Sequence, residues 1–143
     1  MAESIFREKV KQAKLENSIH IESAGTGNWH VGDNPDPRTI RVLQDHGIHH
    51  FSRARQVKSS DFADFDYVIA MDSMNVSDLL KWQGSQPEKI SLMLNWGPSP
   101  TDAIVPDPYY GEMDGFVEVY DLLDKACDEL LVKLMEKMKI VRT

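Results

Sequence analysis

Short apolar segments alternate with amphipathic segments along this chain, and the alternation limits the folds it can adopt. Residues 66–71 and 90–94 are apolar runs of strand length. Residues 116–138 place apolar side chains at helical spacing over about six turns. Strands that alternate with amphipathic helices predict an α/β fold, in which helices cover both faces of a small, mostly parallel sheet to give three α/β/α layers.

Local signals predict further elements around these strands. Asp36 suits the N-cap of a helix with Pro37 in its first turn, and Gly47 suits its C-terminal end. Asp72 opens a helix that runs to about residue 82. The remaining expected elements are a helix over residues 1–15, a strand over 19–23, an extended segment over 51–57 and a helical turn over 60–65.

Ligands of such folds bind beyond the carboxyl ends of the strands. The loops of interest are therefore residues 24–37, 72–75 and 95–114.

Composition excludes several classes of protein. A length of 143 residues suits one domain, residues 1–143. One cysteine, Cys127, allows neither an internal disulfide nor a cysteine-rich zinc site, so a reducing cytoplasm is expected. A net charge of −7 without a basic run disfavours nucleic-acid binding. No apolar stretch approaches the ~20 residues that span a bilayer, so we expect no membrane association.

The loop over residues 95–114 contains the first candidate for chemistry. Asp107 stands between Pro106 and Pro108, whose rings restrict the backbone, and Tyr109 and Tyr110 follow directly. A carboxylate held rigidly beside aromatic rings could act as a general acid. Spacing alone favours the simpler alternative, in which Asp107-Pro108-Tyr109-Tyr110-Gly111 is a turn that the two aromatic side chains anchor.

The glycine-rich loop over residues 23–32 follows the first expected strand, as a phosphate-binding loop would. It lacks both the Lys-Ser/Thr ending of a P-loop and the glycine spacing of a dinucleotide fingerprint, so the signal is weak. Trp29 within it could anchor the core or contact a ligand.

Histidines and the cysteine offer little chemistry. His46, His49 and His50 cluster around a turn, but no further ligand lies at helical metal spacing, so a solvated turn is favoured over a metal site. Cys127 falls on the apolar face of the last helix, where a thiol is usually an inert small side chain.

Six short motifs, taken together, resemble the low-molecular-weight protein tyrosine phosphatases. They occur in the family's order over almost the whole chain: Ser23-Ala24-Gly25-Thr26, Trp29-x-x-Gly32-x-x-Pro35-Asp36-Pro37-Arg38, His46-Gly47-Ile48, Ala54-Arg55-Gln56, Phe65-Asp66-Tyr67-x-x-x-Met71-Asp72-x-x-Asn75 and Asp107-Pro108-Tyr109-Tyr110-Gly111. The resemblance implies a four-stranded parallel sheet with flanking helices. It also implies hydrolysis of phosphotyrosine monoesters through a cysteinyl-phosphate intermediate, without a metal or other cofactor.

The resemblance assigns roles to four residues. Asp107 matches the general acid that protonates the leaving phenolate and then activates water. Tyr109 and Tyr110 match the aromatic residues beside that acid, and Trp29 matches a residue at the rim of the cleft. A slot walled by rings favours a phosphotyrosine protein or another aryl phosphate as the substrate.

The chain departs from the family at its start. Family members begin with a buried strand that leads into Cys-x-x-x-x-x-Arg-Ser/Thr-Pro, which supplies the nucleophile and the guanidinium that holds the phosphate. These residues are absent, and Met1-Ala2-Glu3 matches the Met-Ala-Glu that usually follows the loop. We therefore expect an N-terminally truncated, inactive phosphatase domain without its first, central strand. The codons upstream of Met1 test this, since an immediate stop codon would exclude a misassigned start.

Three consequences and alternatives remain open at this stage. The missing strand predicts reduced stability, or a homodimer that pairs through the unpaired strand edges. A non-catalytic phosphatase-like binding module would show no turnover but a stable fold. The arsenate reductases share the fold but need further cysteines, which this chain lacks.

Overall fold

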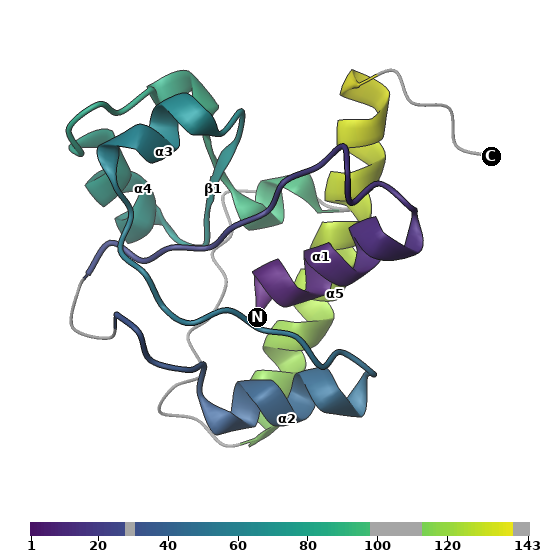
Figure 1. The fold of residues 1–143 in the computed structure, drawn as a ribbon. Coiled ribbons are helices and arrows are strands. Elements are labelled where there is room, and N and C mark those ends of the chain that lie inside the picture. Colours follow the sequence, from purple (N-terminus) through teal and green to yellow (C-terminus); the bar gives the residue numbers. More distant parts are fainter. Residues whose placement is uncertain (28–30, 98–112, 139–143) are drawn as a thin grey trace.

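One long helix, α5, organises the structure. The computed structural model describes residues 1–27, 31–97 and 113–138, and α5 spans Met113–Lys137. Its buried side chains recur at helical spacing: Phe116, Val119, Tyr120, Leu123, Ala126, Cys127, Leu130, Leu131, Leu134 and Met135. Helix α1, Ala2–Gln12, crosses this face and contributes Ile5, Phe6 and Val10 to the same core (Figure 1). Both helices were predicted, and both are confirmed.

An ion cluster clamps α1 to α5 at the edge of this core. Lys9 Nζ lies 2.8 Å from Asp124 Oδ1 and 2.7 Å from Asp128 Oδ1. Burial lowers the pKa of Lys9, but its hydrogen bonds to the two carboxylates outweigh burial and hold the pKa above its usual value. The ammonium therefore stays charged and fixes the crossing of the two helices.

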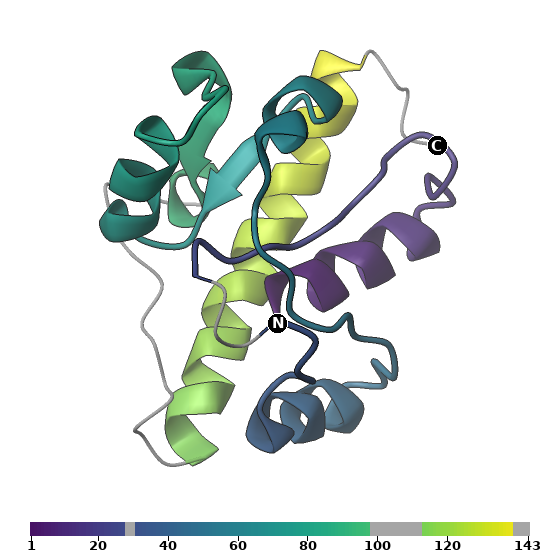
Figure 2. The ribbon, with the colours of Figure 1, turned by 60° about the vertical axis from the view of Figure 1, so that its left-hand side comes forward.

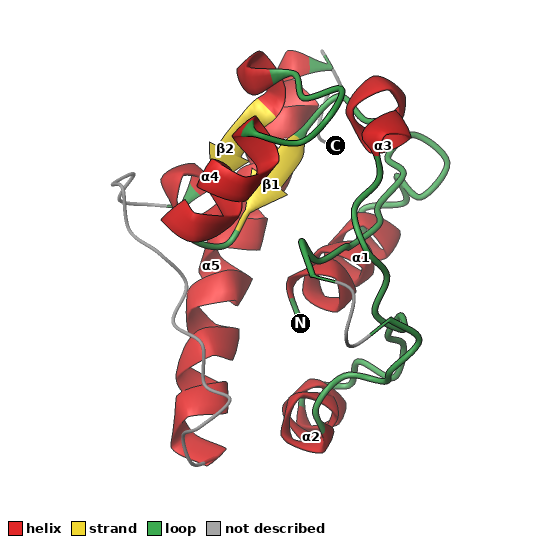
Figure 3. Cartoon of the chain, turned by 90° about the vertical axis from the view of Figure 1, so that its left-hand side faces the viewer, coloured by secondary structure: helices red, strands yellow, loops and turns green. Residues whose placement is uncertain are grey.

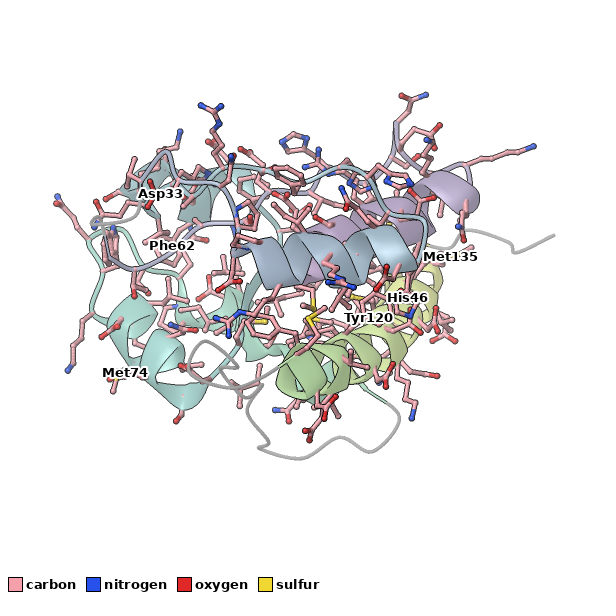
Figure 4. All side chains as sticks on the ribbon, turned by 90° about the horizontal axis from the view of Figure 1, so that it is seen from below. Asp33, His46, Phe62, Met74, Tyr120 and Met135 are labelled. Atoms are coloured by element: carbon pink, nitrogen blue, oxygen red, sulfur yellow. The ribbon has the colours of Figure 1, made fainter. Side chains whose placement is uncertain are left out.

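The sheet consists of two parallel strands among the described residues, β1 (Val68–Ala70) and β2 (Ile90–Leu92), with Val68 opposite Ile90. Side chains of β1 alternate between its faces. Val68 and Ala70 pack in a cluster with helices α3 (Ser59–Asp64) and α4 (Ser73–Leu80), whereas Ile69 packs against the core of α1 and α5. Phe62 is fully buried in the α3–α4 cluster (Figure 4).

Helices thus cover both faces of a parallel sheet, and the predicted α/β class is confirmed. Figure 2 shows α5 running the height of the molecule between the strands with α4 on one side and α1 and α2 on the other. The two strands lie near the C-terminal half of α5 (Figure 3).

Helix α2, Pro37–Asp45, forms for the reasons that its sequence indicated. The Asp36 side chain accepts a hydrogen bond from the Arg38 amide at 2.9 Å, and Pro37 occupies the first turn. Gly47 follows the helix with φ of +78°, a left-handed conformation that glycine adopts without strain. Asp72 caps α4 in the same way through the Asn75 amide at 2.7 Å.

Two short 3₁₀ helices flank β2. One spans Pro87–Lys89 before the strand, and the other spans Met93–Trp96 after it. The predicted strand over 90–94 therefore ends earlier than expected, because Met93 turns away into the core beside α5.

The strand expected over residues 19–23 was wrong. In the structure these residues belong to no strand, and only an isolated parallel bridge joins Gly25 to Gln56. The period-two alternation is local, but a strand also needs a neighbour whose backbone completes its ladder. No described segment lies in register beside residues 19–23. The extended segment over 51–57 likewise pairs only through that bridge.

None of the helices in residues 1–27, 31–97 and 113–138 is both long and apolar enough to cross a membrane.

Candidate functional site

The four candidate site residues lie outside the described residues. Trp29 falls within residues 28–30, and Asp107, Tyr109 and Tyr110 fall within residues 98–112. The structure describes the segments on either side of both stretches, and those segments show how the candidate loops are attached to the fold.

The loop that contains Trp29 is fastened on both sides to the segment before α3. Four backbone hydrogen bonds of 2.7 to 2.8 Å make this attachment: Gly25 N to Arg55 O, Val57 N to Gly25 O, Gly32 N to Ala54 O and Ala54 N to Asp33 O. The Gln56 side chain adds a bond to the Thr26 carbonyl at 3.2 Å. These contacts join the Ala54-Arg55-Gln56 motif to the glycine-rich loop.

A partly buried ion pair holds this supporting segment in place. Arg55 donates two hydrogen bonds to the Asp61 carboxylate, at 2.9 and 3.2 Å, and the Lys58 amide donates a third at 2.9 Å. Burial raises the pKa of Asp61, but the bonds from Arg55 and from the Lys58 amide outweigh burial and lower the pKa below its usual value. Asp61 therefore stays ionised and positions Arg55.

The start of α2 contacts the start of α5, which follows residues 98–112. The Arg38 guanidinium carbon lies 4.4 Å from the centre of the buried Phe116 ring. Arg38 also pairs with Asp36, whose pKa its hydrogen bonds lower. The structure thus brings the start of α2 onto the start of α5.

The only cysteine of the sequence, Cys127, lies in the core that α1 and α5 share. Cys127 is fully buried in α5, and its sulfur lies 4.0 Å from the Ala2 carbonyl oxygen. Burial raises the pKa of the thiol to about 12, so almost none of it is thiolate at neutral pH. The prediction that Cys127 lies on the buried, apolar face of the last helix is confirmed, and its lack of reactivity stays a prediction.

Two of the three clustered histidines, His46 and His50, contact residues of other helices. The His46 ring stacks on the buried Tyr120 ring with a centroid distance of 3.8 Å (Figure 4). His50 Nε2 lies 3.2 Å from Glu8 Oε2. Within the described part of the chain, no three His, Cys, Asp or Glu side chains come close enough to hold a metal ion.

Comparison with known proteins decides the family. The family model described as low molecular weight phosphotyrosine protein phosphatase matches residues 1–140. The chain belongs to this family. Its relatives include the low molecular weight phosphotyrosine protein phosphatase of Schizosaccharomyces pombe, which is 47% identical over 84% of this chain and 78% of its own length. The low molecular weight protein-tyrosine-phosphatase of Streptomyces coelicolor is 38% identical over 97% of this chain and 87% of its own length.

Solved structures agree with this assignment. The protein tyrosine phosphatase of Entamoeba histolytica superposes with a TM-score of 0.88 at 36% identity, covering 96% of this chain and 88% of that one. The family resemblance drawn from the six motifs is therefore confirmed.

The family's nucleophile motif does not occur in the 143 residues. Cys127 is followed six positions later by Lys133, so the sequence contains no Cys-x-x-x-x-x-Arg. The sequence predicted the candidate loops and the helix caps at Asp36 and Asp72. It did not predict the contact of Arg38 with the Phe116 ring or the ion pair of Arg55 with Asp61. Asp36-Pro37-Arg38, which precedes an apolar run, is a local signal for the position of Arg38. No local pattern indicated the pair of Arg55 and Asp61.

Proposed function

We propose that these residues supply the general acid and the aryl-binding walls of an enzyme that hydrolyses phosphotyrosine monoesters. Asp107 is the proposed acid and base, and Trp29, Tyr109 and Tyr110 are the proposed walls. The observation that carries the proposal is the family match over residues 1–140, which includes Asp107-Pro108-Tyr109-Tyr110-Gly111. Phosphotyrosine proteins or aryl phosphates are the proposed substrates.

We further propose that the 143 residues alone do not turn over substrate. The cysteinyl-phosphate route needs a thiolate, and the sole thiol is buried with its pKa raised to about 12. It also needs a guanidinium to hold the phosphate beside that thiolate. Members of such a catalytic set act as a unit, so the loss of the nucleophile removes most of the rate enhancement.

Hydrolysis of p-nitrophenyl phosphate tests both proposals. The 143-residue chain should release no nitrophenol above the buffer blank. A loop-bearing chain, in which the 143 residues follow a strand of about five residues and the family's Cys-x-x-x-x-x-Arg-Ser/Thr-Pro loop, should hydrolyse p-nitrophenyl phosphate and phosphotyrosine but not phosphoserine. Turnover by the 143-residue chain would contradict the second proposal.

A non-catalytic phosphatase-like module, which binds a partner or an aryl ligand through Trp29, Tyr109 and Tyr110, is the second candidate. This alternative predicts that the loop-bearing chain folds but stays inactive. A folded, inactive loop-bearing chain would therefore overturn the phosphatase proposal.

We also propose that the chain forms a homodimer through the free edge of β1. Strand β1 pairs with β2 along one edge, and no other described strand lies along the second edge. Tyr67, at the start of this edge, is 38% exposed. Sedimentation should show a concentration-dependent dimer that Tyr67→Lys weakens, because a charged edge disfavours pairing. A monomer at every concentration would exclude this interface.

Residues 1–143 are proposed to form one domain in the cytoplasm, where a single protonated thiol without a disulfide partner is expected. One calorimetric unfolding transition would agree with a single domain, and two transitions would not. Recovery of a tagged chain with the membrane fraction would argue against the location.

A further inference from the structure

A polar hollow of about 340 Å³ is lined by α1 and by two extended segments, residues 20–23 and 52–55. Its lining includes three arginines, Arg7, Arg53 and Arg55, and two carboxylates, Glu3 and Glu22. None of these residues belongs to the proposed catalytic set. The hollow therefore has more guanidinium than carboxylate groups, in a chain whose net charge is −7.

Both carboxylates already have partners. Glu3 accepts a hydrogen bond from the Ser23 hydroxyl at 3.1 Å and lies 3.6 Å from Arg7. Glu22 lies 3.0 Å from His20 Nε2 and 3.7 Å from Arg55. Each carboxylate thus lies near one of the lining arginines, Glu3 near Arg7 and Glu22 near Arg55, and Arg53 is left without a carboxylate partner among the described residues.

The cationic side chains are not all used in the same way. Arg55 is committed to Asp61 by two hydrogen bonds. Arg7 donates from one nitrogen to the Ile21 carbonyl at 2.7 Å, and its side chain remains 45% exposed. Arg53 is exposed and makes no hydrogen bond or ion pair with any described residue. Each guanidinium has five N–H donors, so Arg7 and Arg53 keep donors for a ligand.

We propose that this hollow binds the dianionic phosphoryl group of inorganic phosphate or of a phosphate monoester. Arg7 is held in position by Ile21, and Arg53 offers a free guanidinium, whose planar fork matches two phosphoryl oxygens. The exposed Ser52 hydroxyl lines the same hollow as a neutral donor. The hollow is proposed as an additional site, because none of its lining residues belongs to the proposed catalytic set of Trp29, Asp107, Tyr109 and Tyr110.

The 143-residue chain suits the test of this site, because phosphate that binds to it cannot be held by a Cys-x-x-x-x-x-Arg loop, which the sequence does not contain. We expect a titration with inorganic phosphate, followed by amide NMR at constant ionic strength, to give saturable shifts confined to residues 3–7, 20–23 and 52–55. Arg53→Gln should weaken this binding about tenfold by removing charge-assisted hydrogen bonds. Its melting temperature should stay unchanged, because Arg53 has no described partner to lose.

Arg41→Gln is the matched control, since Arg41 is an exposed arginine of α2 outside the hollow. It should change the phosphate affinity by less than about twofold. Arg7→Gln should weaken binding about as much as Arg53→Gln does. Equal weakening by Arg41→Gln, or the absence of saturable shifts in these segments, would overturn the site.

Phenyl phosphate distinguishes the two sources of the phosphoryl group. Binding as tight as that of inorganic phosphate would assign the hollow to a monoester, and clearly weaker binding would assign it to the free ion. Both results support a phosphoryl site, and failure of both ligands to bind excludes it. None of these outcomes depends on whether the loop-bearing chain is active.

Discussion

Asp107→Asn in the loop-bearing chain is expected to lower kcat for phosphotyrosine by about 10² to 10⁴, the usual contribution of a general acid. Tyrosine's phenol has a pKa of about 10, so the phenolate is a poor leaving group unless it receives a proton as the P–O bond breaks. An asparagine amide keeps the shape of the side chain but has no proton to give at neutral pH. Steady-state kinetics with phosphotyrosine measure the loss directly.

The leaving group separates acid catalysis from a structural effect. p-Nitrophenolate leaves more easily than tyrosine's phenolate, so Asp107→Asn should slow p-nitrophenyl phosphate much less than phosphotyrosine. A uniform loss with both substrates would indicate a disturbed loop and would argue against the acid role. Asp114→Asn provides the matched control, because Asp114 is an exposed carboxylate in the first turn of α5. Its kcat should stay within about twofold of the parent.

Elements whose determinants lie close together in sequence were predictable. The cap of α2 needs only Asp36, Pro37 and the Arg38 amide, and all three are consecutive. Strand β1 follows from an apolar run because both of its faces are covered, by Ile69 on one side and by Val68 and Ala70 on the other.

Elements that depend on a distant partner were not predictable in the same way. Residues 19–23 alternate as a strand should, yet a ladder depends on a neighbouring backbone that the alternation does not reveal. The hollow of Arg7 and Arg53 also arises from tertiary structure, because it unites α1 with a segment that follows α2. Single arginines at these positions carry no sequence signal.

Some features of the candidate site were likewise predictable from neighbouring residues, and others depended on tertiary structure. The motif around Asp107 could be read locally, since two prolines and two tyrosines surround one carboxylate. The support of the Trp29 loop by the backbone of Ala54 and Arg55 required the fold. The contact of Arg38 with Phe116, which joins the start of α2 to the start of α5, required the fold as well.

Cys127 should react with a thiol reagent about a thousandfold more slowly in the native chain than in the unfolded chain at pH 8. Burial raises the pKa of the thiol from its ordinary 9.0 to about 12, so the thiolate fraction at pH 8 falls by roughly three orders of magnitude. Full burial adds a steric barrier. Labelling with a chromogenic disulfide measures both rates: that of the native chain in buffer and that of the unfolded chain in about 6 M guanidinium.

The matched control moves the thiol to the surface of the same helix. Lys125→Cys in a Cys127→Ala background places the sulfur at an exposed position two residues away, and it should react at nearly the unfolded rate. Fast labelling of Cys127 in a chain with native circular dichroism would contradict its buried position.

The raised pKa also sets how stability depends on pH. The folded chain holds the Cys127 proton more tightly than the unfolded chain, so this contribution to stability is complete below pH 9.0 and is lost as the pH rises toward about 12. Cys127→Ala should remove that part of the alkaline loss, while leaving the turnover of the loop-bearing chain within about twofold. A large loss of turnover on this substitution, with the fold intact, would place the nucleophile in α5 and overturn the assignment of the chemistry to the loop.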